Sequence, residues 1–114
     1  MNLSEKHCKA CEGGVAPLTA DEAQQLKQKL AQSWALSPDA KEIQSTFAFK
    51  NYYHTIAFVN ALAYISHIEN HHPDLEVSYN RCIVRYSTHA IGGLSENDFI
   101  CAAKVDNLIA MYKK

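Results

Sequence analysis

The sequence lacks any apolar stretch long enough to cross a membrane. Its first ten residues, MNLSEKHCKA, contain neither the apolar core of a secretory signal nor the Arg-rich amphipathic pattern of an organelle presequence. We therefore expect a cytoplasmic protein without a membrane partner.

An excess of charge of one sign is also missing. The chain has 11 Lys and Arg residues against 12 Asp and Glu residues, so its net charge is −1, and the basic residues form no block. Because nucleic-acid surfaces depend on clustered positive charge, no direct nucleic-acid partner is expected. The 114 residues, 47% of them hydrophobic, are enough for one domain with a modest core.

Cysteines are few and do not form a complete metal motif. Cys8 and Cys11 have the spacing of half a zinc site, but no second CxxC follows and only His7 stands nearby. A thioredoxin-like role is not supported, because no strand precedes the pair. Cys82 and Cys101 are expected to be small buried side chains.

The amino-terminal segment differs from the rest of the chain. Residues 1–17 are polar, contain Gly13-Gly14 and end at Pro17, which indicates an extended arm. Residues 18–114 then form the single folded domain.

The first half of this domain is expected to contain a helix and two strands. Thr19 and Glu22 form a capping-box signature, and the helix they begin is expected to continue to about residue 31. Trp34 and Leu36 indicate a short strand, and alternating apolar and polar residues over 42–49 indicate a half-buried one.

The second half repeats this pattern of elements. Residues 51–70 contain no Gly or Pro and predict a central helix. Its apolar positions cover a broad sector: Tyr52, Ile56, Phe58, Val59, Leu62, Ala63 and Ile65. Strands are expected at 75–79 and 81–88, and a last helix after Ser95. The order αββαββα predicts an α+β fold with a four-stranded antiparallel sheet and three helices packed on one face.

Four of the six histidines lie in one segment of 25 residues: His67, His71, His72 and His89. Imidazole both gives and takes protons near neutral pH, so this concentration indicates proton transfer or metal binding. His67 and His71 would share one helix face, and Pro73 should end that helix beside them. Single histidines at a helix end often only cap carbonyl groups, but the combination favours a functional site.

A metal hydrolase is the competing interpretation of the histidines. The sequence contains no HExxH motif, because Ile68 follows His67. The carboxylates available as a third ligand are Glu69, Asp74 and Asp98. Asp98 has an equally good alternative role, since it lies where a carboxylate stabilises the first turn of the last helix. We therefore predict no metal.

The spacing of these residues resembles the signature of the pterin-4a-carbinolamine dehydratases. The shared pattern is His67-x3-His71-His72-Pro73-x5-Tyr79-x9-His89-x8-Asp98, together with Gly13-Gly14-Val15-Ala16-Pro17-Leu18, Trp34, Ser87-Thr88-His89 and Gly92-Gly93-Leu94. The resemblance covers nearly the whole chain. Position 67 differs, since family members often carry an acidic residue there.

The resemblance implies an enzyme, a 4a-hydroxytetrahydrobiopterin dehydratase. It would remove water from a 4a-hydroxytetrahydropterin and leave a quinonoid dihydropterin, a reaction in tetrahydropterin recycling that needs one acid and one base and no cofactor. By resemblance His71 and His89 are the proton-transfer pair, in either order, and His72 orients the substrate. Ser87 and Thr88 would bind the pterin's amide edge through their backbone.

The same resemblance completes the substrate site and implies partners. His67 and Asp98 would lie behind the histidines and tune them. Tyr79 is expected to be a core aromatic residue. The partners implied are a second copy in a homodimer or homotetramer and an aromatic amino-acid hydroxylase of the same pathway. The alternative function is a non-enzymatic dimerisation or coactivator-type interaction protein with the same fold.

Overall fold

The sheet is fully antiparallel and has four strands. A computed structural model describes residues 2–10 and 15–113; Cys11 and Gly13-Gly14 lie outside these residues. The strand order is β1-β2-β4-β3. Their bounds are Ala35–Leu36 for β1, Ile43–Ala48 for β2, Asp74–Ser78 for β3 and Arg81–Tyr86 for β4. The central pair β2 and β4 brings the two halves of the domain together.

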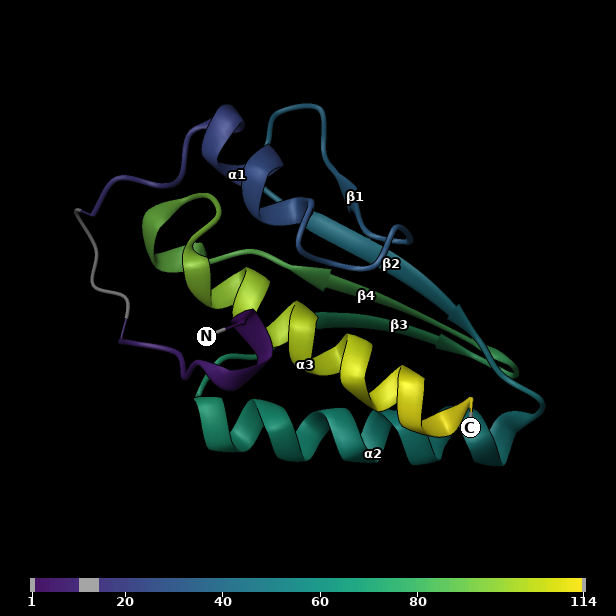
Figure 1. Cartoon of the computed structure of the whole chain (residues 1–114). Coiled ribbons are helices and arrows are strands. Elements are labelled where there is room, and N and C mark those ends of the chain that lie inside the picture. Colours follow the sequence, from purple (N-terminus) through teal and green to yellow (C-terminus); the bar gives the residue numbers. More distant parts are fainter. Residues whose placement is uncertain (1, 11–14, 114) are drawn as a thin grey trace.

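The helices follow the predicted order. They are α1 (Ala20–Lys27), α2 (Tyr52–Glu69) and α3 (Glu96–Tyr112), and two short 3₁₀ turns, η1 (Leu3–Glu5) and η2 (His89–Ile91), complete the described elements. Figure 1 shows α2 and α3 running side by side along the sheet, with α1 near β1. The predicted α+β fold is confirmed.

One face of the sheet forms the core. Alternate residues of the central strands are buried, namely Ile43, Ser45 and Phe47 on β2 and Cys82, Val84 and Tyr86 on β4. Trp34 is 1% exposed and packs edge-on against Phe47 with ring centroids 5.9 Å apart. Apolar area removed from water contributes about 25 cal/mol per Å², so these large rings dominate the core.

Helix α1 is shorter than expected, because it ends at Lys27 and not near residue 31. The capping box at Thr19 is present, so the start was predicted correctly. After Lys27 the turn tightens and brings Leu30 into the core. The amide N–H of Ala31 then donates to the side chain of Asp106 on α3, at 2.9 Å, and not to a carbonyl oxygen of the helix.

The buried side of α2 differs from the predicted apolar sector. Its buried residues are Thr55, Phe58, Leu62 and Glu69, whereas Tyr52 is 48% exposed. Thr55 is tolerated in a buried position because its hydroxyl lies 2.9 and 3.0 Å from the backbone oxygens of Asn51 and Tyr79, and its one proton can be donated to either. Hydrophobic periodicity does not detect such polar residues on a buried face.

Two further features concern apolar residues at the surface. Tyr79 is 63% exposed in the turn between β3 and β4, so the prediction of a core position is wrong.

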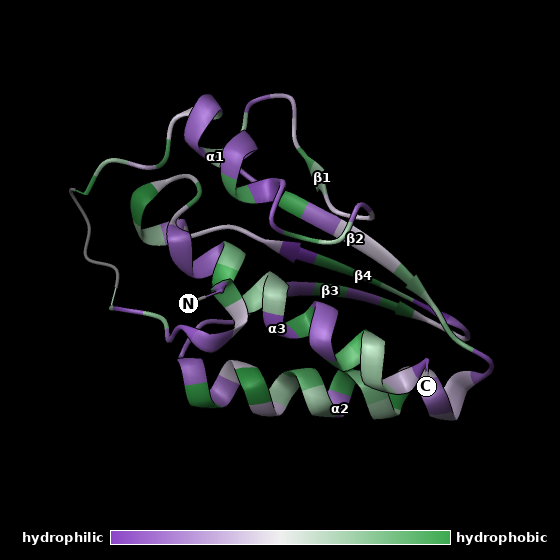
Figure 2. Cartoon of the chain, in the orientation of Figure 1, coloured by the Kyte–Doolittle hydropathy of each residue, from purple (hydrophilic) through white to green (hydrophobic). Residues whose placement is uncertain are grey.

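Figure 2 shows that hydrophobic residues cover much of α2, whereas α1 is mainly hydrophilic. Among the described residues, no helix combines the length and the apolar character that crossing a membrane requires.

Candidate functional site

The end of α2 turns the chain back at the histidines. Asn70 has a left-handed conformation with φ 52°, a geometry that Asn tolerates better than most residues. The amide N–H of His71 bonds to the carbonyl oxygen of Ser66, and β3 begins directly after Pro73. This reversal places the side chain of His71 next to Asp98 on α3.

His71 is held by Asp98. The Nε2 atom of His71 lies 2.7 Å from Oδ1 of Asp98, whose side chain is fully buried, while the His71 side chain is 13% exposed. A carboxylate only accepts hydrogen bonds, so Nε2 carries the proton and donates it. In the neutral ring Nδ1 is then free of a proton and can accept one.

Asp98 also orders the start of α3. Its second oxygen, Oδ2, accepts from the amide N–H of Ser95 at 3.0 Å and from the hydroxyl of Thr88 at 2.8 Å. The two roles considered for Asp98 therefore coexist, since one oxygen caps the helix and the other fixes the histidine. A carboxylate in the first helical turn also matches the helix dipole.

The ring of His71 is stacked on Tyr86. Their centroids are 5.9 Å apart and their planes differ by only 8°. Burial, more than any other cause, raises the pKa of the Tyr86 hydroxyl well above its ordinary value, so this ring stays neutral. Tyr86 and Asp98 together restrict the orientation of the imidazole.

A hollow of about 500 Å³ lies in front of this histidine. His71, His72 and His89 all line it, and so do Ser87 and Thr88. Cavities of some 300–1,000 Å³ typically hold small molecules. The structure thus brings five residues predicted for the site to one place from two separate parts of the chain.

His89 lies on the turn η2 and also lines the hollow. Its side chain is 78% exposed, and its Nε2 lies 4.0 Å from Oδ2 of Asp74. The turn ends at Gly92 with φ 67°, a left-handed conformation that suits glycine. Thr88 and Gly93 exchange backbone hydrogen bonds beneath it, with Thr88 N–H donating at 2.8 Å.

One predicted site residue, His67, lies apart from the histidine group. His67 is exposed on the last turn of α2 and does not line the hollow. The Thr88 amide N–H already donates to Gly93, and its hydroxyl donates to Asp98. Of the pair Ser87 and Thr88, we therefore expect Ser87 to provide the backbone contact to a ligand.

The amino-terminal arm forms a wall of the hollow, which the sequence interpretation missed. Cys8, Lys9 and Ala10 line it, together with Glu69 and Asn97. Glu69 was considered only as a metal ligand, although it is the only Asp, Glu, Lys or Arg between residues 51 and 70. One acidic residue in an otherwise uncharged apolar helix is a signal that could have identified a buried partner for the arm.

Glu69 joins the arm to α2. The residue is 8% exposed, and its carboxylate accepts from the amide N–H of Cys8 at 2.7 Å and from Nδ1 of His7 at 2.9 Å. Burial acts to raise the pKa of Glu69, but these two contacts and the nearby ammonium of Lys104 outweigh it. The pKa therefore lies below the ordinary value of 4.5.

The thiol of Cys8, beside the hollow, is neutral. The sulfur atoms of Cys8 and Cys101 lie 3.4 Å apart. This thiol contact, followed by burial, raises the pKa of Cys8 far above its ordinary value. Burial also raises the pKa of Cys82 to about 11. Neither Cys8 nor Cys82 is therefore poised as a thiolate nucleophile.

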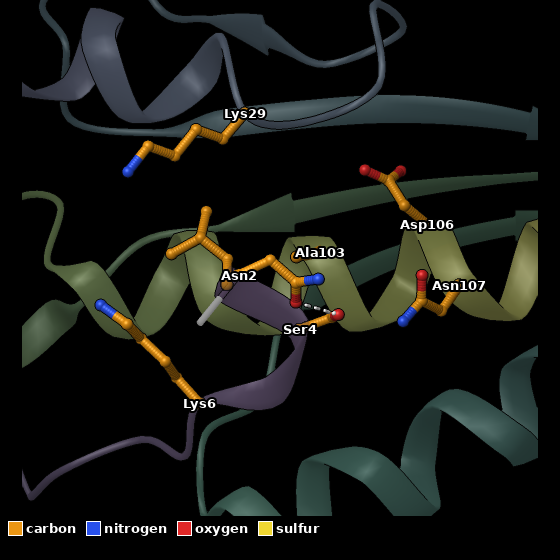
Figure 3. A pocket seen from close by; sticks show the side chains of 8 residues that line it. Asn2, Ser4, Lys6, Lys29, Ala103, Asp106 and Asn107 are labelled. Carbon is orange, nitrogen blue, oxygen red and sulfur yellow. Dashed lines mark hydrogen bonds between the residues drawn. The ribbon is translucent and has the colours of Figure 1, made fainter.

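Another hollow, of about 510 Å³, lies between η1 and α3 (Figure 3). Figure 3 shows Asp106 on α3 and Lys29 across from it. The Asp106 carboxylate already accepts from Trp34 Nε1 at 2.8 Å and from the Ala31 amide, so it holds the fold together. This hollow contains no histidine, in contrast to the first.

No metal-binding arrangement is found within residues 2–10 and 15–113, since no three His, Cys, Asp or Glu side chains there are grouped to hold an ion. His71, His72 and His89 all line the same hollow. One of them is locked by a buried carboxylate, and another is open to solvent.

Comparison with known proteins identifies the family. The sequence profile described as pterin 4 alpha carbinolamine dehydratase matches residues 16–108. The chain belongs to this family. A protein of Nitrosomonas eutropha, provisionally named a pterin-4-alpha-carbinolamine dehydratase, is 60% identical over 108 residues, which cover 95% of this chain and 94% of that protein. A relative from Legionella pneumophila with the same name is 53% identical, with coverage of 95% and 96%.

Solved structures agree with the family assignment. A transcriptional coactivator/pterin dehydratase from Brucella melitensis is similar, with a TM-score of 0.75 and 30% identity over 82% of this chain and 98% of that one. A pterin dehydratase-like protein described as a RuBisCO assembly factor in the alpha-carboxysome has a TM-score of 0.59 and 27% identity. That match covers 68% of this chain and 89% of the neighbour. The descriptions of these two structural neighbours thus name roles other than catalysis.

Proposed function

We propose that this chain is a hydro-lyase that dehydrates a 4a-hydroxytetrahydropterin to a quinonoid dihydropterin during tetrahydropterin recycling. The observation that carries the proposal is the hollow lined by His71, His72 and His89, in which a buried carboxylate holds one imidazole. Proton transfer by side chains is the chemistry this arrangement suits best.

The reaction needs one proton removed and one delivered. The C4a–O bond breaks and its electron pair leaves with the hydroxyl group, which a proton converts to water. Loss of the N5 proton supplies the electron pair for the new C4a–N5 double bond. No electron is gained or lost overall, so acid and base suffice.

We assign the base to His71 and the acid to His89. The Asp98 contact keeps the proton on Nε2 of His71, so Nδ1 is free to take the N5 proton. The imidazolium that forms is stabilised by the same carboxylate. His89 also lines the hollow, with its Nε2 4.0 Å from Oδ2 of Asp74, and it is the imidazole that remains to give a proton to the departing hydroxyl.

The remaining site residues would bind the pterin or hold the catalytic histidine in place. We propose that His72 and the backbone of Ser87 orient the pterin, because both line the hollow. Thr88 and Asp98 would act through hydrogen bonds behind the histidine, where both are buried. His67 would act only indirectly, since it lies on the exposed side of α2.

Single replacements separate these roles. His71→Ala and His89→Ala should each lower kcat by about 10²–10⁴-fold, the usual contribution of a proton-transferring group. His72→Ala should raise KM more than it lowers kcat. His54→Ala is the control: this exposed histidine bonds to the Tyr112 hydroxyl at 3.1 Å, far from the hollow, and its loss should leave both constants unchanged. Equal effects of all four changes would contradict the assignment.

The wider setting is also part of the proposal. We infer a cytoplasmic protein that assembles as a homodimer or homotetramer and receives its substrate from an aromatic amino-acid hydroxylase. The exposed side chains of Tyr53, Tyr64 and Ile68 on α2 support assembly. We keep the division into an arm (1–17) and a domain (18–114), which the family match beginning at residue 16 supports.

A binding function is the second candidate. It is favoured by the two solved neighbours, one described as a transcriptional coactivator/pterin dehydratase and the other as a RuBisCO assembly factor. A non-enzymatic dimerisation or coactivator-type protein of the same fold would keep its assembly without any turnover. A turnover assay on correctly folded, assembled protein separates the two candidates.

A further inference from the structure

We propose that residues 8–10 of the amino-terminal arm form a substrate-contacting wall of the histidine hollow, and that Asn97 is the positioning residue that holds this wall in place. The inference rests on the proposed dehydratase function and extends its binding site to a segment that the site signature does not include. Cys8, Lys9 and Ala10 line the same hollow as the three histidines.

The contact between Asn97 and Lys9 is a two-point clamp. The Lys9 amide N–H donates to Oδ1 of Asn97 at 3.0 Å, and Nδ2 of Asn97 donates to the Lys9 carbonyl oxygen at 2.6 Å. One side-chain amide thus satisfies both backbone groups of a single residue, as a neighbouring strand would. Asn97 is 7% exposed, so little water competes for these two bonds.

The clamp is built on the element that also holds the catalytic histidine. Asn97 and Asp98 are adjacent residues in the first turn of α3. Asp98 fixes His71, and Asn97 fixes the arm. The distance between the base and the wall is therefore set by one helical turn.

A second attachment lies one residue earlier. The Cys8 amide N–H donates to Oε1 of Glu69 at 2.7 Å, and the Cys8 thiol contacts Cys101 on α3. The buried Glu69 carboxylate is also approached by His7 and by Lys104, at 2.9 and 3.7 Å. Cys8 is thus attached to both α2 and α3, and Lys9 is attached to α3.

Anchoring of this kind is expected to affect binding more than chemistry. The wall itself offers no group that could take part in the reaction. The Cys8 thiol is neutral, and the backbone groups of Lys9 are already hydrogen-bonded to Asn97. If the wall contacts the pterin, only molecules with a docked arm bind tightly. The apparent KM then rises in inverse proportion to the docked fraction, while kcat of the bound complex is retained.

Two variants test the clamp from its two sides. Asn97→Ala changes the folded domain and removes both hydrogen bonds to Lys9. Lys9→Pro changes the arm and removes the N–H that donates to Asn97, while every residue of the folded domain is retained. Lys6→Ala is the matched control. It breaks another arm contact, the 3.0 Å ion pair with Glu96, which is exposed and does not line the hollow.

The readouts are kcat and KM for a chemically generated 4a-hydroxytetrahydropterin, and the Kd for 7,8-dihydrobiopterin, which lacks the leaving hydroxyl. We expect both clamp variants to raise KM and Kd about tenfold, the effect of losing roughly one net hydrogen bond's free energy. Their kcat should stay within about twofold of the intact protein. Lys6→Ala should match the intact protein in all three constants.

The outcomes separate the two proposals. If the intact protein turns over the carbinolamine while Asn97→Ala and Lys9→Pro keep its KM and Kd, the wall is not part of the binding site and this inference is wrong. The inference is also wrong if both variants lower kcat and leave KM unchanged. That result would mean that the contact between Asn97 and Lys9 supports the neighbouring Asp98 and, through it, His71, and does not shape the binding site. If the intact protein neither binds nor dehydrates a pterin, the proposed function fails and the inference fails with it.

Discussion

The imidazole of His71 and the carboxylate of Asp98 are joined by a 2.7 Å contact across 27 residues of sequence. This contact sets the tautomer of the histidine, and the carboxylate is buried where no substrate can reach it. The arrangement resembles the orienting carboxylates of other acid–base enzymes, whose replacement leaves the geometry largely intact and removes the correct proton position.

Asp98→Asn should therefore lower kcat by about 10–100-fold without unfolding the protein. The amide oxygen of Asn can still cap α3, so far-ultraviolet circular dichroism should be unchanged. The matched control is Asp106→Asn, a change at another carboxylate of α3, which accepts bonds from Ala31 and Trp34. That variant should lower the midpoint of thermal unfolding and retain kcat. Equal kcat for Asp98→Asn and the intact protein would contradict the orienting role.

Assembly should depend on the outer face of α2. Tyr53 is 80% exposed and borders an apolar groove of about 440 Å³ between α2 and α3, which Met111 also lines. Exposed apolar surface of this kind is typical of a subunit interface. Tyr53→Glu should lower the mass measured by sedimentation equilibrium at micromolar concentration, and Gln24→Glu on the exposed face of α1 should not. An intact protein that sediments as a monomer would disprove the prediction.

Glu69 should make stability depend on pH in the acid range. Because its pKa in the folded state lies below the ordinary value of 4.5, the ionised carboxylate stabilises the fold at and above about pH 4.5. That contribution is lost as the pH falls from 4.5 through the lower folded-state pKa. Glu69→Gln should be less stable at neutral pH and should lose less stability over the acid range, as measured by urea unfolding at a series of pH values. Parallel pH profiles for the two proteins would show that Glu69 contributes nothing to this dependence.

The cysteines should not take part in the reaction. Thiol contact and burial raise the pKa of Cys8, and burial raises that of Cys82 to about 11, so few thiolates exist near neutral pH. Replacement of all four cysteines by alanine should retain kcat within about threefold, and iodoacetamide should label Cys8 and Cys82 of the folded protein slowly. Loss of turnover with the fold preserved would count against the proposed mechanism.

The sequence alone was sufficient to predict the order of elements. Strict alternation over β2 and β4 and the capping box at Thr19 are local signals, and the structure agrees with each of them. The end of α1 could not be predicted, because it depends on a contact between Ala31 and Asp106, which lie 75 residues apart. Local patterns carry no information about such partners.

The site was predictable only in part for the same reason. His71, His72 and His89 were identified by their residue type and spacing, and they do line one hollow. The wall formed by Cys8 to Ala10 was not identified, because it depends on hydrogen bonds to Glu69 and Asn97 that no periodicity reveals. The opposite error occurred at Tyr79, where alternation predicted a buried ring and the turn exposes it.

The most direct test of the account is the rate at which quinonoid dihydropterin forms from a chemically generated 4a-hydroxytetrahydropterin, measured by absorbance with and without this protein. The intact protein should accelerate the reaction strongly, and the double replacement of His71 and His89 by alanine should reduce the rate to nearly that of the solution without protein. If the double variant dehydrates the carbinolamine as fast as the intact protein, histidine acid–base catalysis is wrong. If the intact protein gives no acceleration, the chain is not a dehydratase.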